Sequence, residues 1–321
     1  MNRKYNLLIE LLKKHDLYLL VWIFINAITI KIQNHNIALT KVVQYKKHEC
    51  CKRYLRKNYK DIIDKYFVIC KKRSYKDIDN ISVDSPIWVF WGQGQDNMPY
   101  PVNLCIQSII KFSGIREVFV LDFNNYKQYV TLPDYIEKKL KAGIISYAHF
   151  ADVLRLALLK EYGGIWIDST FYMCNEFPAE IIEYPFYSIN QNGERDWVVT
   201  KDKWSIGLLA SHKNNVLVDF WYEFIIKYWE KENAAITYLF PDCLLAIGYE
   251  DIPYIREMIN DIPVNNMDAF VFIGEFRNKV ADEEIFGDLI KNNFLFQVTY
   301  KQSYNTEIQG QKTYFGRLIE C

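Results

Sequence analysis

HFADVLRLALLKEYGGIWIDST, residues 149–170, is the stretch of sequence that indicates the fold. Apolar residues recur within it at the spacing of an amphipathic helix, which we expect to span Tyr147–Tyr162. Gly163 and Gly164 end that helix, because glycine readily adopts the backbone conformation that follows a last helical turn. The apolar run Ile165–Ile167 then predicts a buried strand, with Asp168 at its carboxyl end.

Strands and helices are expected to alternate on both sides of this stretch. The apolar and aromatic runs predict strands at Pro86–Trp91, Glu117–Leu121, Phe186–Ile189, Trp197–Thr200 and Ser205–Ala210. Helical spacing predicts helices at Val102–Phe112, Tyr135–Lys141, Asn215–Glu230, Ala235–Ile247 and Glu283–Lys291. This alternation is typical of an α/β fold whose sheet is mostly parallel and has helices on its faces.

Polar residues follow three of the expected strands and predict a ligand site. Gly92–Gly94, Asp122 and Asp168 each come at a strand's carboxyl end, where open α/β sheets bind ligands. Asp152 and Arg155 are three residues apart on the expected helix and therefore share a face. Carboxylates that hold a divalent cation, together with an arginine, suit a sugar-diphosphate. The alternative is a surface ion pair beside a strand-end Asp, and the spacing does not separate the two interpretations.

Two other polar residues have a simpler interpretation. Asp242 follows Pro241 and predicts the N-cap of a helix, with a role on the acceptor side as the alternative. His149 lies one turn before Asp152, where it is either an ordinary helix-start histidine or a proton carrier.

The longer pattern A-D-x-x-R-x-x-x-L-x-x-x-G-G-x-W-x-D-x-T, residues 151–170, resembles the signature of glycosyltransferases with a sugar-binding DXD region. It is most similar to the bacterial capsular polysaccharide synthesis family. IWVFWGQG (87–94) and VLDFNNY (120–126) resemble that family's opening strands in the same order. The resemblance covers residues 85–210 closely and the C-terminal third loosely. It implies a GT-A-like, Rossmann-type glycosyltransferase domain.

The resemblance also implies roles for single residues. Trp91 and Gly92 match positions where the first strand meets the nucleotide base and ribose, and Asp122 matches a position near the nucleotide. Asp152 and Arg155 match the helix residues that hold the donor sugar.

A divalent cation, Mn²⁺ or Mg²⁺, is implied in the same way. Asp168 matches the first acid of the DXD region, which binds the metal and the diphosphate, so that Asp152, Arg155 and Asp168 form the expected catalytic group. The chain departs from a full DXD at Thr170, and a hydroxyl is a poorer cation ligand than a carboxylate.

The function that the resemblance implies is transfer of a hexose, with retention of configuration, from a nucleotide sugar, with a UDP-sugar favoured. The acceptor would be a glycan or a lipid-linked glycan of capsular or other surface polysaccharide synthesis. A sugar nucleotidyltransferase is disfavoured, because no glycine-rich phosphate loop with a Lys or Arg follows the first strand. A non-catalytic scaffold of a polysaccharide assembly complex, with its site decayed at Thr170, is the alternative outside enzymes.

The composition excludes other classes of protein. The 321 residues are 50% hydrophobic, which excludes a disordered chain, and 39 basic residues balance 39 acidic ones. Zero net charge argues against a nucleic-acid binder that works by bulk attraction. The seven cysteines are odd in number and form no CxxC pair, so we expect reduced thiols and a cytoplasmic location.

The charge is unevenly distributed along the chain. Residues 1–84 hold 18 basic and 8 acidic side chains, whereas residues 85–321 hold 21 and 31. We therefore expect a basic, mostly helical N-terminal region (1–84) followed by the glycosyltransferase domain (85–321).

An apolar run, Leu17–Ile30, precedes the densest basic segment, Lys41–Lys76. Fourteen helical residues span about 21 Å, too little for a bilayer core of about 30 Å. The run is either a helix buried against the body or an interfacial helix whose basic neighbour lies on anionic lipid. The second interpretation predicts peripheral attachment to the inner face of the plasma membrane.

Overall fold

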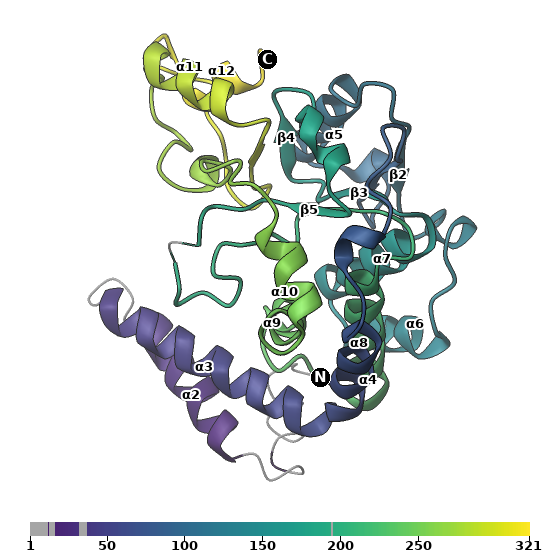
Figure 1. The fold of residues 1–321 in the computed structure, drawn as a ribbon. Coiled ribbons are helices and arrows are strands. Elements are labelled where there is room, and N and C mark those ends of the chain that lie inside the picture. Colours follow the sequence, from purple (N-terminus) through teal and green to yellow (C-terminus); the bar gives the residue numbers. More distant parts are fainter. Residues whose placement is uncertain (1–11, 13–16, 32–36, 194) are drawn as a thin grey trace.

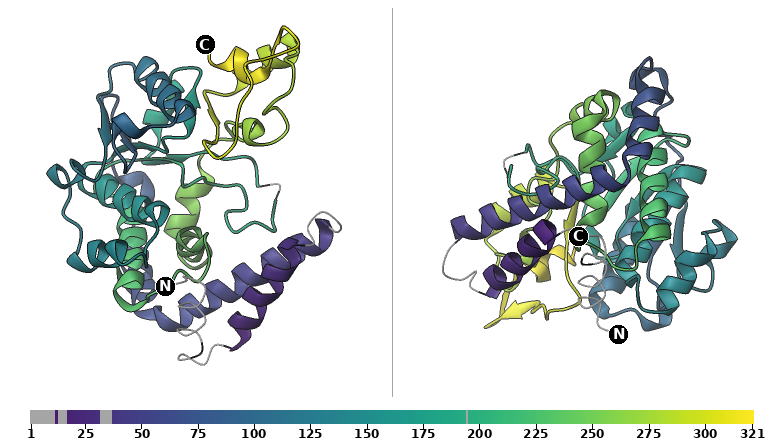
Figure 2. Two further views of the ribbon diagram at one scale, coloured as in Figure 1. Left: turned by 180° about the vertical axis from the view of Figure 1, so that it is seen from behind. Right: turned by 90° about the horizontal axis from the view of Figure 1, so that it is seen from below.

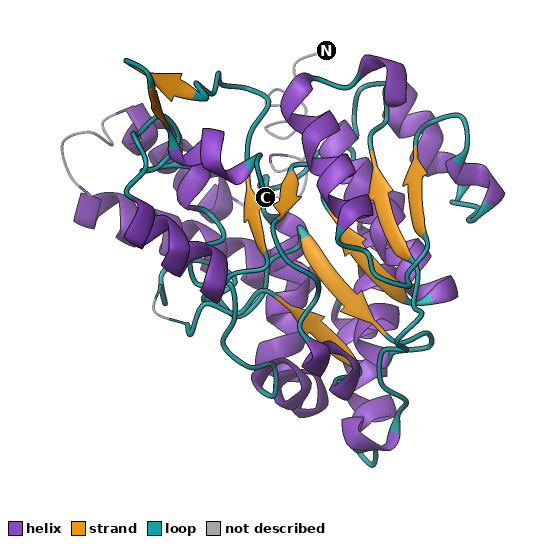
Figure 3. Cartoon of the chain, turned by 90° about the horizontal axis from the view of Figure 1, so that it is seen from above, coloured by secondary structure: helices purple, strands orange, loops and turns teal. Residues whose placement is uncertain are grey.

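A mixed sheet of five strands forms the centre of the protein in the computed structural model, which describes residues 12, 17–31, 37–193 and 195–321 (Figure 3). The strand order is β2-β1-β3-β6-β5. The strands are β1 (Ile87–Phe90), β2 (Val118–Leu121), β3 (Gly164–Ile167), β5 (Phe186–Ser188) and β6 (Leu208–Ser211). β1 is parallel to β2 and β3, whereas β6 is antiparallel to β3 and β5. The predicted α/β class is confirmed, but the sheet is parallel only in its first three strands.

The connections around β1 create a topological switch point. α5 (Tyr100–Lys111) joins β1 to β2, and α6 (Asp134–Lys141) with α7 (Tyr147–Tyr162) joins β2 to β3. Because β2 and β3 lie on opposite sides of β1, right-handed crossovers place α5 and α7 on opposite faces of the sheet (Figure 1). The carboxyl ends of β1 and β3 therefore meet at a topological switch point, where ligands of such sheets bind.

The turn from α7 into β3 depends on its two glycines. Ser146 begins α7, since its hydroxyl accepts a hydrogen bond from the His149 N–H at 3.1 Å. Gly163 and Gly164 have φ of +68° and +100°, values that residues other than glycine rarely adopt. A Cβ on Gly164 would lie 2.4 Å from the carbonyl oxygen of Pro86. The turn thus brings β3 against the residue before β1 and fixes where Asp168 falls.

Helices are stacked in series on the α7 side of the sheet. α8 (Val216–Lys231) packs on α7, α9 (Phe240–Asp251) on α8, α3 (Ile37–Asn58) on α9, and α2 (Leu17–Lys31) on α3 (Figures 1 and 2). α4 (Lys60–Cys70) and α10 (Pro253–Asn260) flank this stack. The described part of the chain before residue 71 is therefore mostly helical, and α2 is the outermost of these helices.

Buried hydrogen bonds and ion pairs join α3 and α4 to the body. The hydroxyls of Tyr54 and Tyr59 both donate to Glu232, at 2.8 and 2.9 Å. Arg56 donates to Asp251 at 2.7 Å, and both tyrosines are almost fully buried. The division of the chain at residues 84 and 85 remains a prediction.

The apolar run of the N-terminal region combines features of both interpretations. Leu19 is fully buried, and Trp22 and Ile23 are half-buried against the main core. Phe24 and Ile28, in contrast, are 68% and 46% exposed. Residues 1–11, 13–16 and 32–36 lie outside the described part of the chain, as does the side chain of Ile30. None of the helices that the structure describes is long and apolar enough to cross a bilayer.

The C-terminal segments form a second, smaller hydrophobic cluster beside α5 (Figure 1). β4 (Phe171–Met173), which follows Asp168, pairs antiparallel with β7 (Leu295–Gln297). The other elements of this part are α11 (Glu283–Asn292), β8 (Glu307–Ile308), β9 (Gln311–Lys312) and α12 (Tyr314–Leu318). Short 3₁₀ turns lie at Tyr75–Asp77, Gln95–Asn97, Tyr126–Gln128, Ala179–Glu183 and Val271–Ile273.

Three predicted elements differ from the structure. The strand expected from Ser205 begins three residues later, as β6. Trp197–Thr200 forms turns instead of a strand. Lys201 and Asp202 follow with φ of +48° and +56°, and Asp202 forms an ion pair with Arg195 at 2.7 Å, so the loop closes on itself. The helix expected from Ala235 begins five residues later, as α9.

Candidate functional site

Arg155 joins the two carboxylates that the sequence predicts beside it. Its Nη1 lies 3.2 Å from Asp152 Oδ1, and its Nη2 donates to Asp168 Oδ1 at 2.9 Å. Nη1 also donates to the carbonyl oxygen of Ile206 at 2.6 Å, and the guanidinium carbon lies 5.0 Å from the centre of the Trp166 ring. The structure therefore brings Asp152, Arg155 and Asp168 together at the carboxyl end of β3. The two carboxylates, the Ile206 carbonyl and the Trp166 ring all contact the guanidinium.

Burial determines the electrostatics of this cluster. Arg155 is 3% exposed and Asp152 is 7% exposed. Burial raises the pKa of Asp152 to about 7; the positive charge of Arg155 opposes this rise, and the nearby carboxylates of Asp168 and Asp242 add to it. Asp152 can therefore gain or lose a proton near neutral pH.

The two carboxylate oxygens of Asp168 have different surroundings. Oδ1 accepts from Arg155 and also from Trp166 Nε1 at 2.8 Å, which fixes the orientation of the carboxylate. Oδ2 has no donor among the described residues. A Cβ on Gly207 would lie 3.2 Å from Oδ2, so glycine at that position keeps space open. Because the Asp168 side chain is 29% exposed, a ligand could reach Oδ2 from solvent.

A divalent cation fits Asp168 as a partial site. No group of three or more His, Cys, Asp or Glu side chains in the described ranges is placed to hold a metal ion. Thr170, two residues after Asp168, is half-buried and offers only a hydroxyl. Asp168 Oδ2 would therefore be the protein's principal ligand, and a diphosphate and water would have to supply most of the others.

Asp242 is a further carboxylate near this site, for which the sequence predicted an N-cap and offered a role on the acceptor side only as the alternative. It lies inside α9, after the helix has begun at Phe240, so the prediction of an N-cap is wrong. It is 3% exposed, and its Oδ1 accepts from Trp204 Nε1 at 3.0 Å. Burial raises the pKa of Asp242 to about 6. The signal that could have found it is a carboxylate inside the apolar run FPDCLLAI (240–247).

His149 is a packing residue in this structure. Its Nε2 lies 3.1 Å from the carbonyl oxygen of Tyr238, and its ring packs among Trp229, Tyr238 and Phe240. The ordinary interpretation of His149 therefore accounts for its contacts.

The residues expected to hold the nucleotide lie at the ends of β1 and β2. A Cβ on Gly92 would lie 2.5 Å from the Phe123 ring, so only glycine fits there without movement. Asp122 Oδ1 accepts from the backbone N–H groups of Asn124 and Asn125, at 2.7 and 3.0 Å, and shapes the turn after β2. Within the described chain, no hydrogen bond or ion pair joins Asp122 to the Arg155 cluster.

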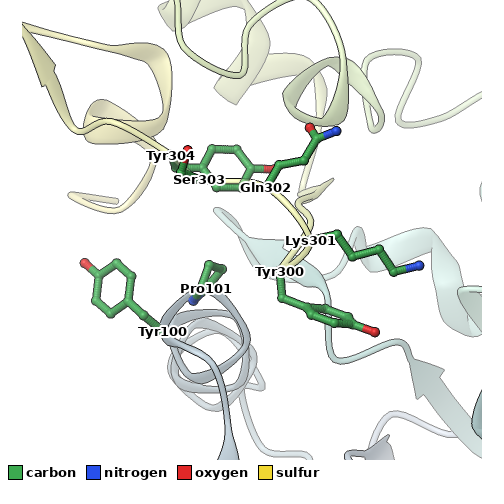
Figure 4. A pocket seen from close by; sticks show the side chains of 7 residues that line it. All are labelled: Tyr100, Pro101, Tyr300, Lys301, Gln302, Ser303 and Tyr304. Atoms are coloured by element: carbon green, nitrogen blue, oxygen red, sulfur yellow. The ribbon is translucent and has the colours of Figure 1, made fainter.

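Trp91 contacts a segment that the sequence did not connect with the site. Its ring lies edge-on to that of Tyr300, with ring centroids 5.2 Å apart. Tyr300 also borders a cavity of about 420 Å³ between the start of α5 and the loop before β8 (Figure 4). The lining residues are Tyr100, Pro101, Tyr300, Lys301, Gln302, Ser303 and Tyr304. The C-terminal segment therefore lies beside the carboxyl end of β1 and carries aromatic, amide, hydroxyl and ammonium groups there.

Comparison with known proteins gives a family. A family model described as "Capsular polysaccharide synthesis protein" matches residues 31–318. The chain is 24% identical over 163 residues to glycosyltransferase afumC of Aspergillus fumigatus, covering 45% of this chain and 40% of that protein. It is 25% identical over 169 residues to O-glycosyltransferase braB of Annulohypoxylon truncatum, covering 47% and 39%. The chain thus matches about two fifths of the length of these relatives. Among solved structures, the PaToxG glycosyltransferase aligns with a TM-score of 0.40 and 17% identity, over 67% of this chain and 83% of that one.

Proposed function

The chain belongs to the capsular polysaccharide synthesis protein family, and we propose that it is a glycosyltransferase with a GT-A-like domain. The observation that carries the proposal is the Asp152–Arg155–Asp168 cluster at the carboxyl end of β3. Two relatives that match part of the chain are named glycosyltransferases, which supports the same activity. The finer proposal is transfer of a hexose from a UDP-sugar, with retention, onto a glycan or a lipid-linked glycan.

The edge of the sheet formed by the carboxyl ends of β1 and β3 would hold the donor. The nucleotide would bind near Trp91, Gly92 and Asp122, where the Trp91 ring offers a surface for stacking. The sugar would contact Asp152 and Arg155 at the other end. This order follows from the strand order, because β1 and β3 are neighbours in the sheet.

Bond cleavage in such a reaction leaves negative charge on the departing diphosphate. Arg155 supplies a fixed positive charge, since Ile206, Trp166 and both carboxylates restrict its movement. Asp168 Oδ2 and the Thr170 hydroxyl would hold Mn²⁺ or Mg²⁺, which when bound neutralises charge on the leaving group. Asp152, with its raised pKa, would contact sugar hydroxyls as a donor or an acceptor of hydrogen bonds. No side chain is assigned as a base or nucleophile.

The test is donor hydrolysis followed by mass spectrometry, across a panel of nucleotide sugars with and without Mn²⁺. A glycosyltransferase should hydrolyse one donor slowly even without its acceptor, and that donor should raise the melting temperature of the chain. Release of pyrophosphate from a nucleoside triphosphate and a sugar phosphate would instead identify a nucleotidyltransferase.

A non-catalytic scaffold is the second candidate. It is favoured by Thr170 and by the lack of a three-carboxylate metal group among the described residues. A chain that hydrolyses no donor and gains no thermal stability from any would support the scaffold and contradict the proposed activity.

A further inference from the structure

Helices α2 and α3 pack side by side as a hairpin on the outside of the helical stack (Figures 1 and 2). The end where α2 stops and α3 begins points away from the sheet, whereas the C-terminal half of α3 lies on α9. The hairpin therefore presents a surface that the rest of the described chain does not cover.

The exposed side chains that the structure describes on α2 form one apolar stripe. Tyr18, Val21, Phe24 and Ile28 follow one another at helical spacing and are 51, 53, 68 and 46% exposed. The opposite side of the helix holds Leu19, which is fully buried. Among the described side chains of α2, the side with Leu19 packs against the protein and the other side leaves large apolar groups in water.

The exposed surface of α3 changes from apolar to basic along the helix. Leu39 and Val42, near the hairpin end, are 48 and 54% exposed. Lys46, Arg53 and Lys57 continue the same stripe toward the body and are also exposed.

A contact between the helices places the two stripes on one face. The guanidinium carbon of Arg53 lies 4.2 Å from the centre of the Tyr18 ring. We call this surface the hairpin face; it consists of Tyr18, Val21, Phe24, Ile28, Leu39, Val42, Lys46, Arg53 and Lys57.

The cations of the hairpin face are distinct from those that hold α3 to the body. Lys52 and Arg56 form ion pairs with Glu250, and Lys52 also pairs with Glu49, the acid that lies between Lys46 and Arg53. Lys46, Arg53 and Lys57 form no ion pair with any acid in the described part of the chain. The face therefore carries net positive charge beside exposed apolar groups.

We propose that the hairpin face binds the surface of an anionic lipid bilayer. Apolar side chains at the hairpin end would enter the interface, and the cations nearer the body would contact anionic headgroups. Charge favours lipid over a second copy of the chain, because two such faces would bring cation against cation. A lipid-linked acceptor would lie at the same surface, although lipid binding does not depend on the proposed activity.

Co-sedimentation of the full chain with vesicles tests the proposal. The vesicles contain phosphatidylcholine alone, or phosphatidylcholine with phosphatidylglycerol, at low and high salt. We expect binding that requires phosphatidylglycerol and weakens with salt. Lys46→Glu with Lys57→Glu should weaken binding at least about fivefold for each cation removed. Val21→Ser, Phe24→Ser and Ile28→Ser together should remove most of it.

Matched variants on other surfaces serve as controls. Lys138→Glu with Lys141→Glu changes two exposed lysines of α6, and Ile110→Ser, Ile115→Ser and Val264→Ser change three exposed apolar residues. Both controls should bind vesicles as the wild-type chain does, and all variants should keep the donor hydrolysis of the wild type. A wild-type chain that stays in the supernatant with anionic vesicles overturns the proposal. An equal loss of binding in the control variants also overturns it. So does a dimer in sedimentation velocity that is abolished by the combined Val21→Ser, Phe24→Ser and Ile28→Ser changes.

Discussion

Asp168 is the residue at which the proposed chemistry can be tested most directly. One carboxylate oxygen accepts from Arg155 and Trp166, and the other has no donor in the described chain. Asp168→Asn keeps the shape and removes the charge. We expect donor turnover to fall at least about 100-fold, comparable with the loss of one charge-stabilising group in other active sites. The chain should still fold, because the residue lies at a strand end and is partly exposed, but the melting temperature should fall, because buried Arg155 loses the charge of one of its two carboxylate partners.

Asp219→Asn is the matched control for this substitution. Asp219 lies on α8 and pairs with Lys160, away from the end of β3. Its variant should keep wild-type turnover in the same mass-spectrometric assay. If Asp168→Asn also keeps it, Asp168 does not act on the diphosphate.

Asp242 predicts a specific dependence of stability on pH. Its pKa is about 6 in the folded chain, against an ordinary value of 3.8. Between these values the folded chain retains a proton that the unfolded chain has released, so the free energy of unfolding falls as pH rises through this window. Above about pH 6 the destabilisation is complete.

Asp242→Asn removes this dependence while keeping an oxygen that can accept from Trp204. The free energy of unfolding of the variant, relative to that of the wild type, should therefore be higher at pH 7 than at pH 4 by on the order of 2 kcal/mol. Urea denaturation at the two pH values measures the difference. If the difference in free energy of unfolding between variant and wild type is the same at pH 4 and pH 7, Asp242 does not titrate as described.

The site residues that the sequence predicted lie close together in the chain. Asp152 and Arg155 are on one helical face, and a two-glycine turn leads from that helix to Asp168, so short-range geometry predicts their meeting. Asp242 and Tyr300 reach the site through packing between elements that are distant in the chain. Their positions depend on how α9 and the C-terminal segment fold back, which local spacing does not encode.

At the scale of elements, the turn from α7 to β3 is the most constrained connection. Gly164 has φ of +100°, and a Cβ there would collide with the Pro86 carbonyl oxygen. Gly164→Ala should therefore lower the free energy of unfolding by at least about 2 kcal/mol. It should also lower donor turnover, because β3 carries Asp168. Chemical denaturation and the hydrolysis assay measure the two effects.

Gly287 provides the opposite case for comparison. It lies inside α11, and a Cβ there would meet nothing within 4 Å. Gly287→Ala should stabilise the chain by about 0.5–1 kcal/mol, since alanine favours the helix. Equal effects of the two substitutions would contradict the role given to the Gly164 turn.

Element prediction succeeded where the sequence had strong periodicity and clear ends. Helix α7 has the predicted bounds, because its serine cap and glycine stop bracket a regular apolar face. Trp197–Thr200 was wrong because the residues after it adopt positive φ in a loop closed by Arg195 and Asp202. That ion pair depends on side chains seven residues apart and leaves no periodic signal.

At the scale of the whole molecule, the uneven charge indicated a helical N-terminal region but not how it is joined to the body. Some of its basic residues neutralise acids of α9, as Arg56 does with Glu250 and Asp251. Tyr54 and Tyr59 reach a buried acid near the end of α8. Pairings of this kind link residues far apart in the chain, so composition alone could not predict them.

These contacts predict that α3 and α4 stabilise the rest of the chain, whereas α2 contributes little. Leu55, Tyr59 and Ile62 are nearly fully buried in the same hydrophobic cluster as the sheet. Deletion of residues 1–84 would expose the surfaces of α8 and α9 that they cover, at a cost of about 1.5–3 kcal/mol for each large side chain lost. Deletion of residues 1–36 removes α2, of whose described side chains only Leu19 is fully buried.

Calorimetry of the full chain and of the two shortened chains measures this difference. The full chain should unfold in one transition, the chain without residues 1–36 should melt within a few degrees of it, and the chain without residues 1–84 should melt far lower or fail to fold. We expect this outcome because the burial of several large side chains contributes more free energy than the whole free energy of unfolding of an ordinary domain. A chain without residues 1–84 that keeps the wild-type melting temperature would instead show that residues 85–321 form an independent domain, as the charge distribution first indicated.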